Sequence, residues 1–103
     1  MLSPDLLEKI EKIDKNLNTN FEQEYIEKVF ARSMKLSEEV GELISEILKK
    51  FYKKREQSFD ETNLKQEFAD VILTTLLLAK SLDIDINECL AMKLKKIEER
   101  GGF

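Results

Sequence analysis

The stretches Glu38-Glu39-Val40-Gly41-Glu42 and Glu67-Phe68-Ala69-Asp70 each place two carboxylates three positions apart within a segment of helical hydrophobic spacing. Residues with this spacing share one face of a helix. The resulting pairs are Glu39 with Glu42 and Glu67 with Asp70. Four carboxylates converge if the two helices pack side by side, and like charges at ~4–6 Å destabilise a fold unless a cation neutralises them. This arrangement predicts a site for a hard metal ion with oxygen ligands on facing helices.

Hydrophobic spacing along the rest of the chain predicts helices and no strand. Apolar residues recur at intervals of three and four, which is typical of amphipathic helices. Only three Gly and one Pro among 103 residues agree with a mostly helical protein. We expect four helices, over about residues 4–16, 21–54, 64–82 and 86–100.

Capping residues mark the expected helix ends. Ser, Asn and Asp side chains accept hydrogen bonds from the first turn of a helix, and Gly favours the conformation that follows the last turn. The predicted starts are Ser3 with Pro4, Asn20 with Gln23, Asn63 with Gln66, and Asp85 with Glu88. The polar run 16–20 is expected to end the first helix, and Gly101-Gly102 the last.

Both acidic pairs lie at the border of an apolar stripe rather than on an outward face. This position favours a partly desolvated site at a seam between helices, where a carboxylate needs a partner. Glu46 lies near the face of Glu39 and is either an outer ligand or ordinary surface. The third helix is apolar over more than one stripe, so we expect it to be buried on two sides.

Lys93, Lys96 and Arg100 share one face of the last predicted helix. Cations beside a carboxylate–metal cluster suit a polyphosphate substrate, because Lys and Arg support the phosphate charge that metal ions leave. These side chains can equally lie over apolar surface and complement the C-terminal end of the helix dipole. Both interpretations stay open.

Composition excludes several classes of protein. The formal net charge of −4 provides no basic surface for nucleic acid. The N-terminus lacks the pattern of a secretory leader, and the longest apolar stretch is too short to span a membrane. A lone Cys89 excludes a disulfide framework, and the absence of His excludes Ser-His-Asp hydrolases and Glu-x-x-His di-iron bundles. We expect one cytoplasmic domain over residues 1–103 that binds neither nucleic acid nor membrane.

The order of these features resembles the MazG-like branch of the all-α nucleoside triphosphate pyrophosphohydrolases, a group that also includes dimeric dUTPases and dCTP pyrophosphatases. The resemblance covers roughly residues 25–100. It rests on Glu-Glu-Val-Gly-Glu, the later Glu-x-x-Asp, Ile-Asp-Ile-Asn-Glu and a terminal Lys-Leu-x-Lys-x-x-x-Arg. It implies a four-helix-bundle-type fold that is completed by oligomerisation as a homodimer or homotetramer. Residues 1–20 are then an N-terminal helix and linker, and residues 21–100 the catalytic helices.

The resemblance also implies an activity and roles for the site residues. Family members hydrolyse nucleoside triphosphates to the monophosphate and pyrophosphate with Mg²⁺. For this chain the expected cofactor is therefore Mg²⁺, with Mn²⁺ as an alternative, and nucleotide-pool sanitation is one role of such an activity. The implied metal ligands are Glu39, Glu42, Glu67 and Asp70, with Glu38 as a supporting or water-orienting carboxylate and Lys93, Lys96 and Arg100 as phosphate contacts. The chain departs from many relatives at Ile97 and at Gly101-Gly102, which concerns sugar and base contacts rather than the metal.

Two other functions fit the same residues. One is a non-catalytic helical interaction module whose acidic seam pairs with a basic partner. The other is a hydrolase of another pyrophosphate-containing small molecule. Stoichiometric Mg²⁺ binding separates the first from an enzyme, and a panel of nucleotides separates the second from a nucleoside triphosphate pyrophosphohydrolase.

Overall fold

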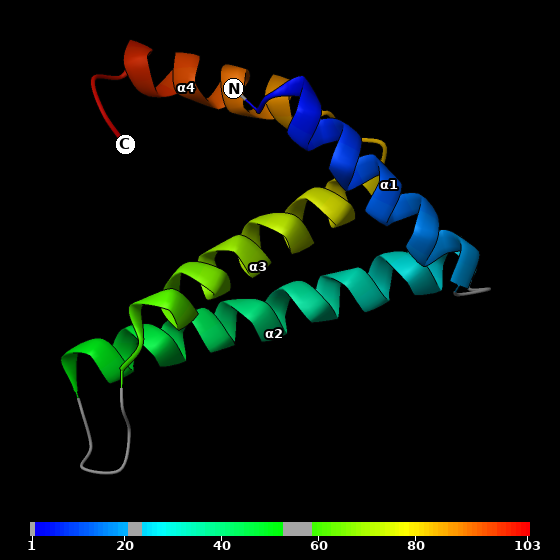
Figure 1. The fold of residues 1–103 in the computed structure, drawn as a ribbon. Helices are drawn as coiled ribbons and strands as arrows, with labels where there is room; N and C mark the ends of the chain where they lie inside the picture. The colour runs from blue at the N-terminus through cyan, green and yellow to red at the C-terminus, as the bar shows by residue number, and fades with distance from the viewer. Residues whose placement is uncertain (1, 21–23, 53–58) are drawn as a thin grey trace.

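The computed structural model describes residues 2–20, 24–52 and 59–103. These residues form four helices and no strand (Figure 1). The helices are α1 (Pro4–Asn20), α2 (Tyr25–Phe51), α3 (Glu61–Ser81) and α4 (Ile86–Glu99). The all-α class and the four helices predicted from the sequence are therefore confirmed.

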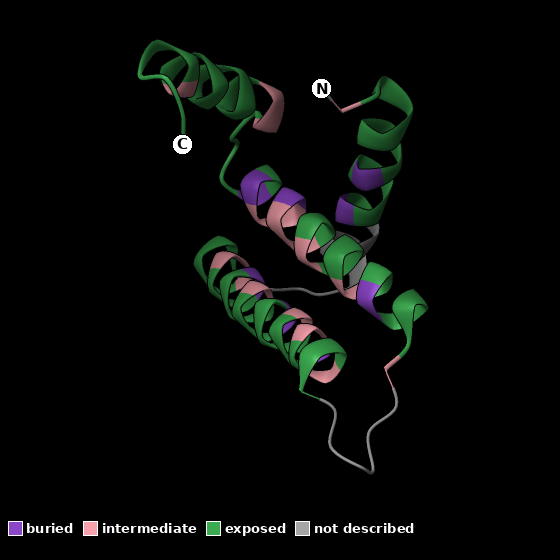
Figure 2. Cartoon of the chain, turned by 90° about the vertical axis from the view of Figure 1, so that its left-hand side faces the viewer, coloured by how far each residue is buried: buried purple, intermediate pink, exposed green. Residues whose placement is uncertain are grey.

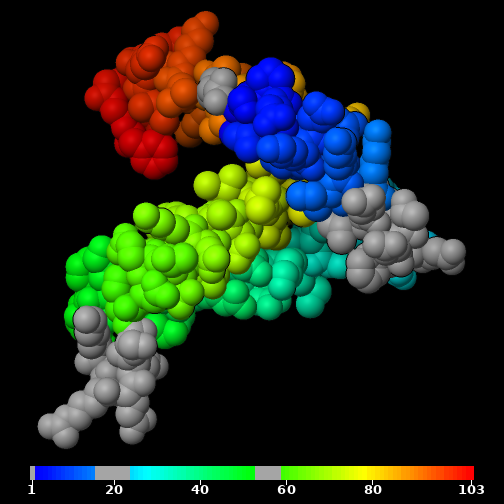
Figure 3. Space-filling model, in the orientation of Figure 1, coloured from blue at the N-terminus to red at the C-terminus, as the bar shows by residue number. Residues whose placement is uncertain are grey.

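The architecture is centred on an antiparallel pair formed by α2 and α3, which lie side by side along their length (Figure 1). The helix α1 packs against the C-terminal half of α3. The helix α4 projects away from the α2–α3 pair and lies apart from it (Figures 1 and 3), and we call it the arm. The closest packing in the described chain is thus between the two helices that carry the acidic stretches.

Local chemistry explains two of the predicted helix starts. The Leu6 N–H donates to Ser3 Oγ at 3.2 Å as α1 begins at Pro4. The Glu88 N–H donates to Asp85 Oδ1 at 3.2 Å at the start of α4. Both caps satisfy a backbone donor that a helix leaves free in its first turn. The predictions at Ser3 and Asp85 are confirmed.

The other two predicted starts are wrong. Asn63 lies inside α3, and Asp60 caps that helix by accepting from the Thr62 N–H at 2.9 Å. Asp and Asn cap helices equally well, so the sequence pattern does not distinguish Asp60 from Asn63 as the N-cap. Asn20 is the last residue of α1, and Glu24 stands at the N-cap of α2, while Gln23 lies outside the described residues.

The polar run 16–20 does not end the first helix, which continues to Asn20. Asn and Thr cost only about 0.5 kcal/mol each in a helix relative to Ala, and a helix that is already formed extends through such residues. The second helix is continuous from Tyr25 to Phe51. Its predicted ends at residues 21 and 54 lie outside the described residues.

The C-terminal ends of α3 and α4 share one geometry. At the end of α4, the Gly102 N–H donates to the Ile97 carbonyl at 3.0 Å and the Gly101 N–H to the Glu98 carbonyl at 3.2 Å, with Gly101 at φ 77°. This is a Schellman motif, and it confirms the predicted end. At the end of α3, Asp83 takes the position of the glycine with φ 56°.

The core is small for the amount of apolar surface. Among the described residues the buried hydrophobic side chains are Ile10 on α1 and Leu64, Leu76 and Ala79 on α3. Figure 2 colours buried residues purple, and they lie on α1, α2 and α3. The chain exposes 8201 Å², whereas a compact monomer of this mass exposes about 6,000 Å². Within one chain α3 is only partly covered, because α2 lies along it and α1 packs against its C-terminal half, while Phe68, Ile72 and Leu73 stay exposed. The expectation of two-sided burial is therefore not met by a single chain.

Candidate metal site

Three carboxylates gather on α2. Glu38, Glu39 and Glu42 each place an oxygen within 4.8 Å of the other two. Helical spacing produces this group, because Glu39 and Glu42 lie three positions apart and Glu38 precedes them. Glu39 is buried, and Glu38 and Glu42 are exposed. The group therefore reaches from the α2–α3 seam to the solvent.

A second group joins the two helices. Glu39, Glu67 and Asp70 each place an oxygen within 4.8 Å of the other two. Glu39 belongs to both groups, so the side-by-side packing of α2 and α3 brings the four predicted ligands and Glu38 into one cluster. We call these five residues the acidic cluster. Their role as metal ligands stays a prediction.

Two oxygens of the acidic cluster are buried without a hydrogen-bond partner, Glu39 Oε2 and Glu67 Oε2. A buried carboxylate oxygen without a partner costs free energy, and such atoms are rare in folded proteins. Glu39 and Glu67 both belong to the group that spans the two helices. These oxygens are suited to coordinate a cation at the seam.

Electrostatic repulsion acts within the cluster. The negative charge of Glu39 raises the pKa of the Glu42 carboxyl above 4.5, with smaller contributions from desolvation and from Glu67 and Glu38. The cluster therefore favours positive charge nearby. In the described structure Lys35 provides such a charge, because its Nζ lies 3.1 Å from Glu39 Oε1 and 3.4 Å from Glu38 Oε1. These contacts raise the pKa of Lys35, with the hydrogen bond to Glu39 as the largest cause.

The donor set indicates which ions fit. All five members of the acidic cluster offer carboxylate oxygens, and the sequence has no His. Hard cations such as Mg²⁺ and Mn²⁺ prefer oxygen ligands, whereas softer ions select thiolate or imidazole. The residues present therefore fit Mg²⁺ or Mn²⁺ by charge and by chemistry.

The predicted phosphate contacts do not join the acidic cluster within one chain. Lys93, Lys96 and Arg100 are exposed on α4 or directly after it, on the arm that lies apart from the α2–α3 pair (Figure 1). Arg100 Nε donates to the Gly102 carbonyl at 3.2 Å. One chain thus holds the carboxylates and these cations in separate places.

Two features near the cluster extend the sequence interpretation. Lys35 was not among the predicted site residues, although its place three and four positions before Glu38 and Glu39 puts it on their face. Glu46 is buried and pairs with Lys49 at 3.0 Å. Glu46 is therefore neither ordinary surface nor a member of the groups that could hold an ion in the described chain.

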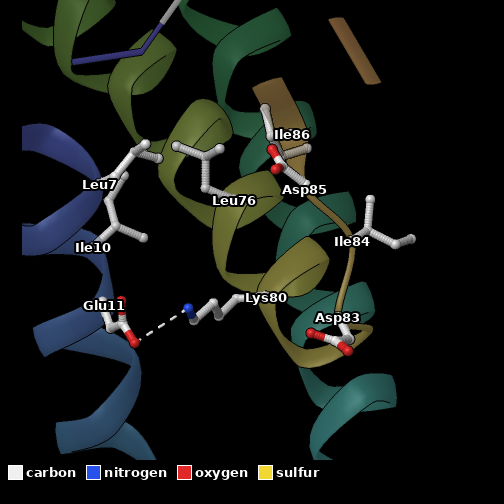
Figure 4. A pocket seen from close by; sticks show the side chains of 9 residues that line it. All are labelled: Leu7, Ile10, Glu11, Leu76, Lys80, Asp83, Ile84, Asp85 and Ile86. Carbon is white, nitrogen blue, oxygen red and sulfur yellow. Dashed lines mark ion pairs between the residues drawn. The ribbon is translucent and has the colours of Figure 1, made fainter. Parts of the chain in front are cut away.

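A cavity of about 350 Å³ lies elsewhere, between α1, the end of α3 and the start of α4 (Figure 4). Its apolar lining includes Leu7, Ile10 and Leu76, and an ion pair between Lys80 and Glu11 of 3.4 Å crosses its edge. None of the predicted site residues lines it. The cavity and the acidic cluster are separate features.

Comparison with known proteins adds one finding. The family model described as the MazG nucleotide pyrophosphohydrolase domain matches residues 31–102. The match includes every member of the acidic cluster and the whole of α3 and α4, and it leaves out α1. Searches of curated proteins and of solved structures gave no match. In the described residues, no helix is both long and apolar enough to cross a membrane.

Proposed function

The chain belongs to the MazG nucleotide pyrophosphohydrolase family, and we propose that it hydrolyses nucleoside triphosphates to the monophosphate and pyrophosphate with Mg²⁺. The observation that carries this proposal is the acidic cluster, in which Glu39 joins carboxylates of two helices and two buried oxygens lack partners. Nucleotide-pool sanitation is the role that we propose for this activity.

Each member of the acidic cluster has a proposed task. The proposed metal ligands are Glu39, Glu42, Glu67 and Asp70. A divalent ion held there would supply positive charge for the phosphate oxygens and increase the acidity of water. Glu38 is exposed at the edge of the cluster, where its carboxylate can orient water and accept a proton. Mn²⁺ fits the same oxygen ligands as Mg²⁺.

We also propose that the active form is a homodimer or homotetramer. Apolar side chains stay exposed on α3 and α4, among them Phe68, Ile72, Leu90 and Leu94. One chain exposes about 2,000 Å² more than a compact monomer of its mass, which exceeds the ~800 Å² that each partner buries in a standard protein interface. When two copies associate, the side chains of Lys93, Lys96 and Arg100 can contact phosphates that are bound at the acidic cluster of the partner copy.

A reducing cytoplasm is the compartment that we propose. Cys89 is a free, exposed thiol, and such thiols persist where disulfides do not form. The proposed substrates are charged nucleotides, which do not cross membranes unaided. The net charge of −4 agrees with a partner that is a small molecule rather than a nucleic acid.

The test is pyrophosphate release from a panel of nucleoside triphosphates, with and without Mg²⁺. We expect Glu39→Gln and Asp70→Asn each to reduce turnover by about 100-fold or more, since each removes a charged ligand. Glu8→Gln is the matched control, because it neutralises an exposed carboxylate on α1 outside the cluster. Full Mg²⁺-dependent activity in the two cluster variants would overturn the proposal.

Calorimetry with Mg²⁺ distinguishes the alternatives. An enzyme of the proposed kind binds Mg²⁺ stoichiometrically, and Glu39→Gln weakens this binding. A helical interaction module shows no such binding. If Mg²⁺ binds and no nucleoside triphosphate is cleaved, a panel of other pyrophosphate-containing small molecules becomes the next test.

A further inference from the structure

Lys35 is the cation that the described structure places in contact with the acidic cluster. Its ammonium lies 3.1 Å from Glu39 Oε1 and 3.4 Å from Glu38 Oε1. The side chain is 55% exposed, whereas that of Glu39 is 7% exposed. Lys35 therefore reaches from the solvent side towards a buried carboxylate, at the edge through which a substrate would approach.

Two cations compete for the same carboxylate. Glu39 belongs to both groups that could hold an ion, so a metal bound there shares the carboxylate that Lys35 contacts through Oε1. The charge of the metal neutralises that carboxylate and repels the ammonium of Lys35. A divalent ion carries twice the charge of an ammonium group and binds several carboxylates at once. The pair of Lys35 with Glu39 is a half-exposed ion pair of modest strength. A metal can thus displace Lys35 at little cost.

The displaced ammonium of Lys35 can bind a phosphate of the substrate. Its four-carbon stem is flexible, and its charge is compact, which suits it to a phosphate oxygen. Lys93, Lys96 and Arg100 lie on the arm and do not reach the cluster of their own chain. Resting on the proposed function, we infer that Lys35 changes partner, from Glu38 and Glu39 in the metal-free protein to a phosphate of the nucleotide once the metal is bound.

The test uses Lys35→Met and Lys35→Arg in the full chain, with two measurements. Calorimetry without nucleotide should show that Lys35→Met binds Mg²⁺ about two- to fivefold more tightly, because the competing ion pair is absent. Pyrophosphate release at saturating Mg²⁺ should show a KM about tenfold or more higher, because a charge-assisted contact to phosphate is lost. Lys35→Arg keeps the positive charge and should stay near the wild-type values in both measurements.

Lys9→Met is the matched control. Lys9 also pairs with a carboxylate four positions away, Asp5 on α1 at 3.2 Å, but both side chains of this pair are exposed and neither residue is in the acidic cluster. This variant should change neither the Mg²⁺ affinity nor the KM. The inference is overturned if Lys35→Met leaves either quantity unchanged while the wild type binds Mg²⁺ and cleaves nucleotide. A wild type that binds no Mg²⁺ overturns the proposed function and this inference together.

Discussion

Arg32 Nη1 on α2 lies 2.7 Å from Asp14 Oδ1 on α1 and donates a hydrogen bond to the Leu77 carbonyl on α3 at 2.8 Å. The two charged side chains are 10% and 11% exposed. One guanidinium therefore holds three helices together at the place where α1 meets the α2–α3 pair. These polar contacts of Arg32 add to the contacts of the small apolar core in joining the helices.

Arg32→Met should destabilise the protein by about 3–5 kcal/mol, because it leaves the carboxylate of Asp14 buried without its cation. Chemical denaturation monitored by circular dichroism measures this loss. Asp14→Leu combined with Arg32→Met should recover most of it, since an apolar pair of similar volume has no charge to desolvate. If the single variant loses less than about 1 kcal/mol, the pair is not the junction that its burial indicates.

Asp83→Gly should stabilise the protein by up to about 1 kcal/mol. Asp83 has φ 56°, and the Schellman hydrogen bond from the Ile84 N–H to the Ala79 carbonyl at 2.9 Å requires that conformation. Glycine adopts it without steric cost. Thermal unfolding measures the gain. The reverse exchange, Gly101→Asp at the corresponding position after α4, should lower stability. If both variants change the thermal midpoint in the same direction, this explanation is contradicted.

Short-range chemistry made much of this fold predictable. Ser3 and Asp85 cap helices as expected, and Gly101 ends α4, because a cap needs only neighbouring residues. The convergence of the acidic pairs was also predictable. Spacing placed them at stripe borders, and two helices that bury neighbouring stripes must bring such borders together.

Long-range geometry was not predictable in the same way. Asp83 in a left-handed conformation lacks the glycine that usually marks such an end. The pairing of Asp14 with Arg32 depends on the angle at which α1 crosses the α2–α3 pair. The spacing of hydrophobic residues does not predict this angle. The helix α4 lies apart from the α2–α3 pair, and its own apolar pattern does not indicate that place. The sequence therefore indicated the face of Lys93 but not its distance from the cluster.

Mg²⁺ should raise the thermal midpoint of the wild type, because an ion that binds only the folded cluster shifts the equilibrium towards the folded state. At a Mg²⁺ concentration 100 times the Kd, the gain is about 2.7 kcal/mol. Glu67→Gln should lose most of this gain, since Glu67 Oε2 is one of the two buried oxygens without a partner. Differential scanning fluorimetry across Mg²⁺ concentrations measures both. An equal gain in Glu67→Gln would show that Mg²⁺ acts elsewhere.

Glu42→Gln should stabilise the metal-free protein at pH 7 by a small amount. The charge of Glu39 raises the pKa of Glu42 above its ordinary value of 4.5, with added effects of Glu38 on α2 and Glu67 on α3. A carboxyl with a raised pKa binds its proton more tightly in the folded state. Glu42 therefore contributes stability as the pH falls through its folded pKa towards 4.5, and opposes folding above that range.

The measurement is the difference in thermal midpoint between wild type and Glu42→Gln, in EDTA, at several values of pH. The variant should be the more stable at pH 7, and the difference should shrink as Glu42 of the wild type is protonated. Glu8→Gln controls for the loss of an exposed charge outside the cluster. A difference that does not change with pH would mean that repulsion from Glu39 is absent. Because the same repulsion draws a cation, Glu42→Gln should also weaken Mg²⁺ binding, which separates it from a merely stabilising change.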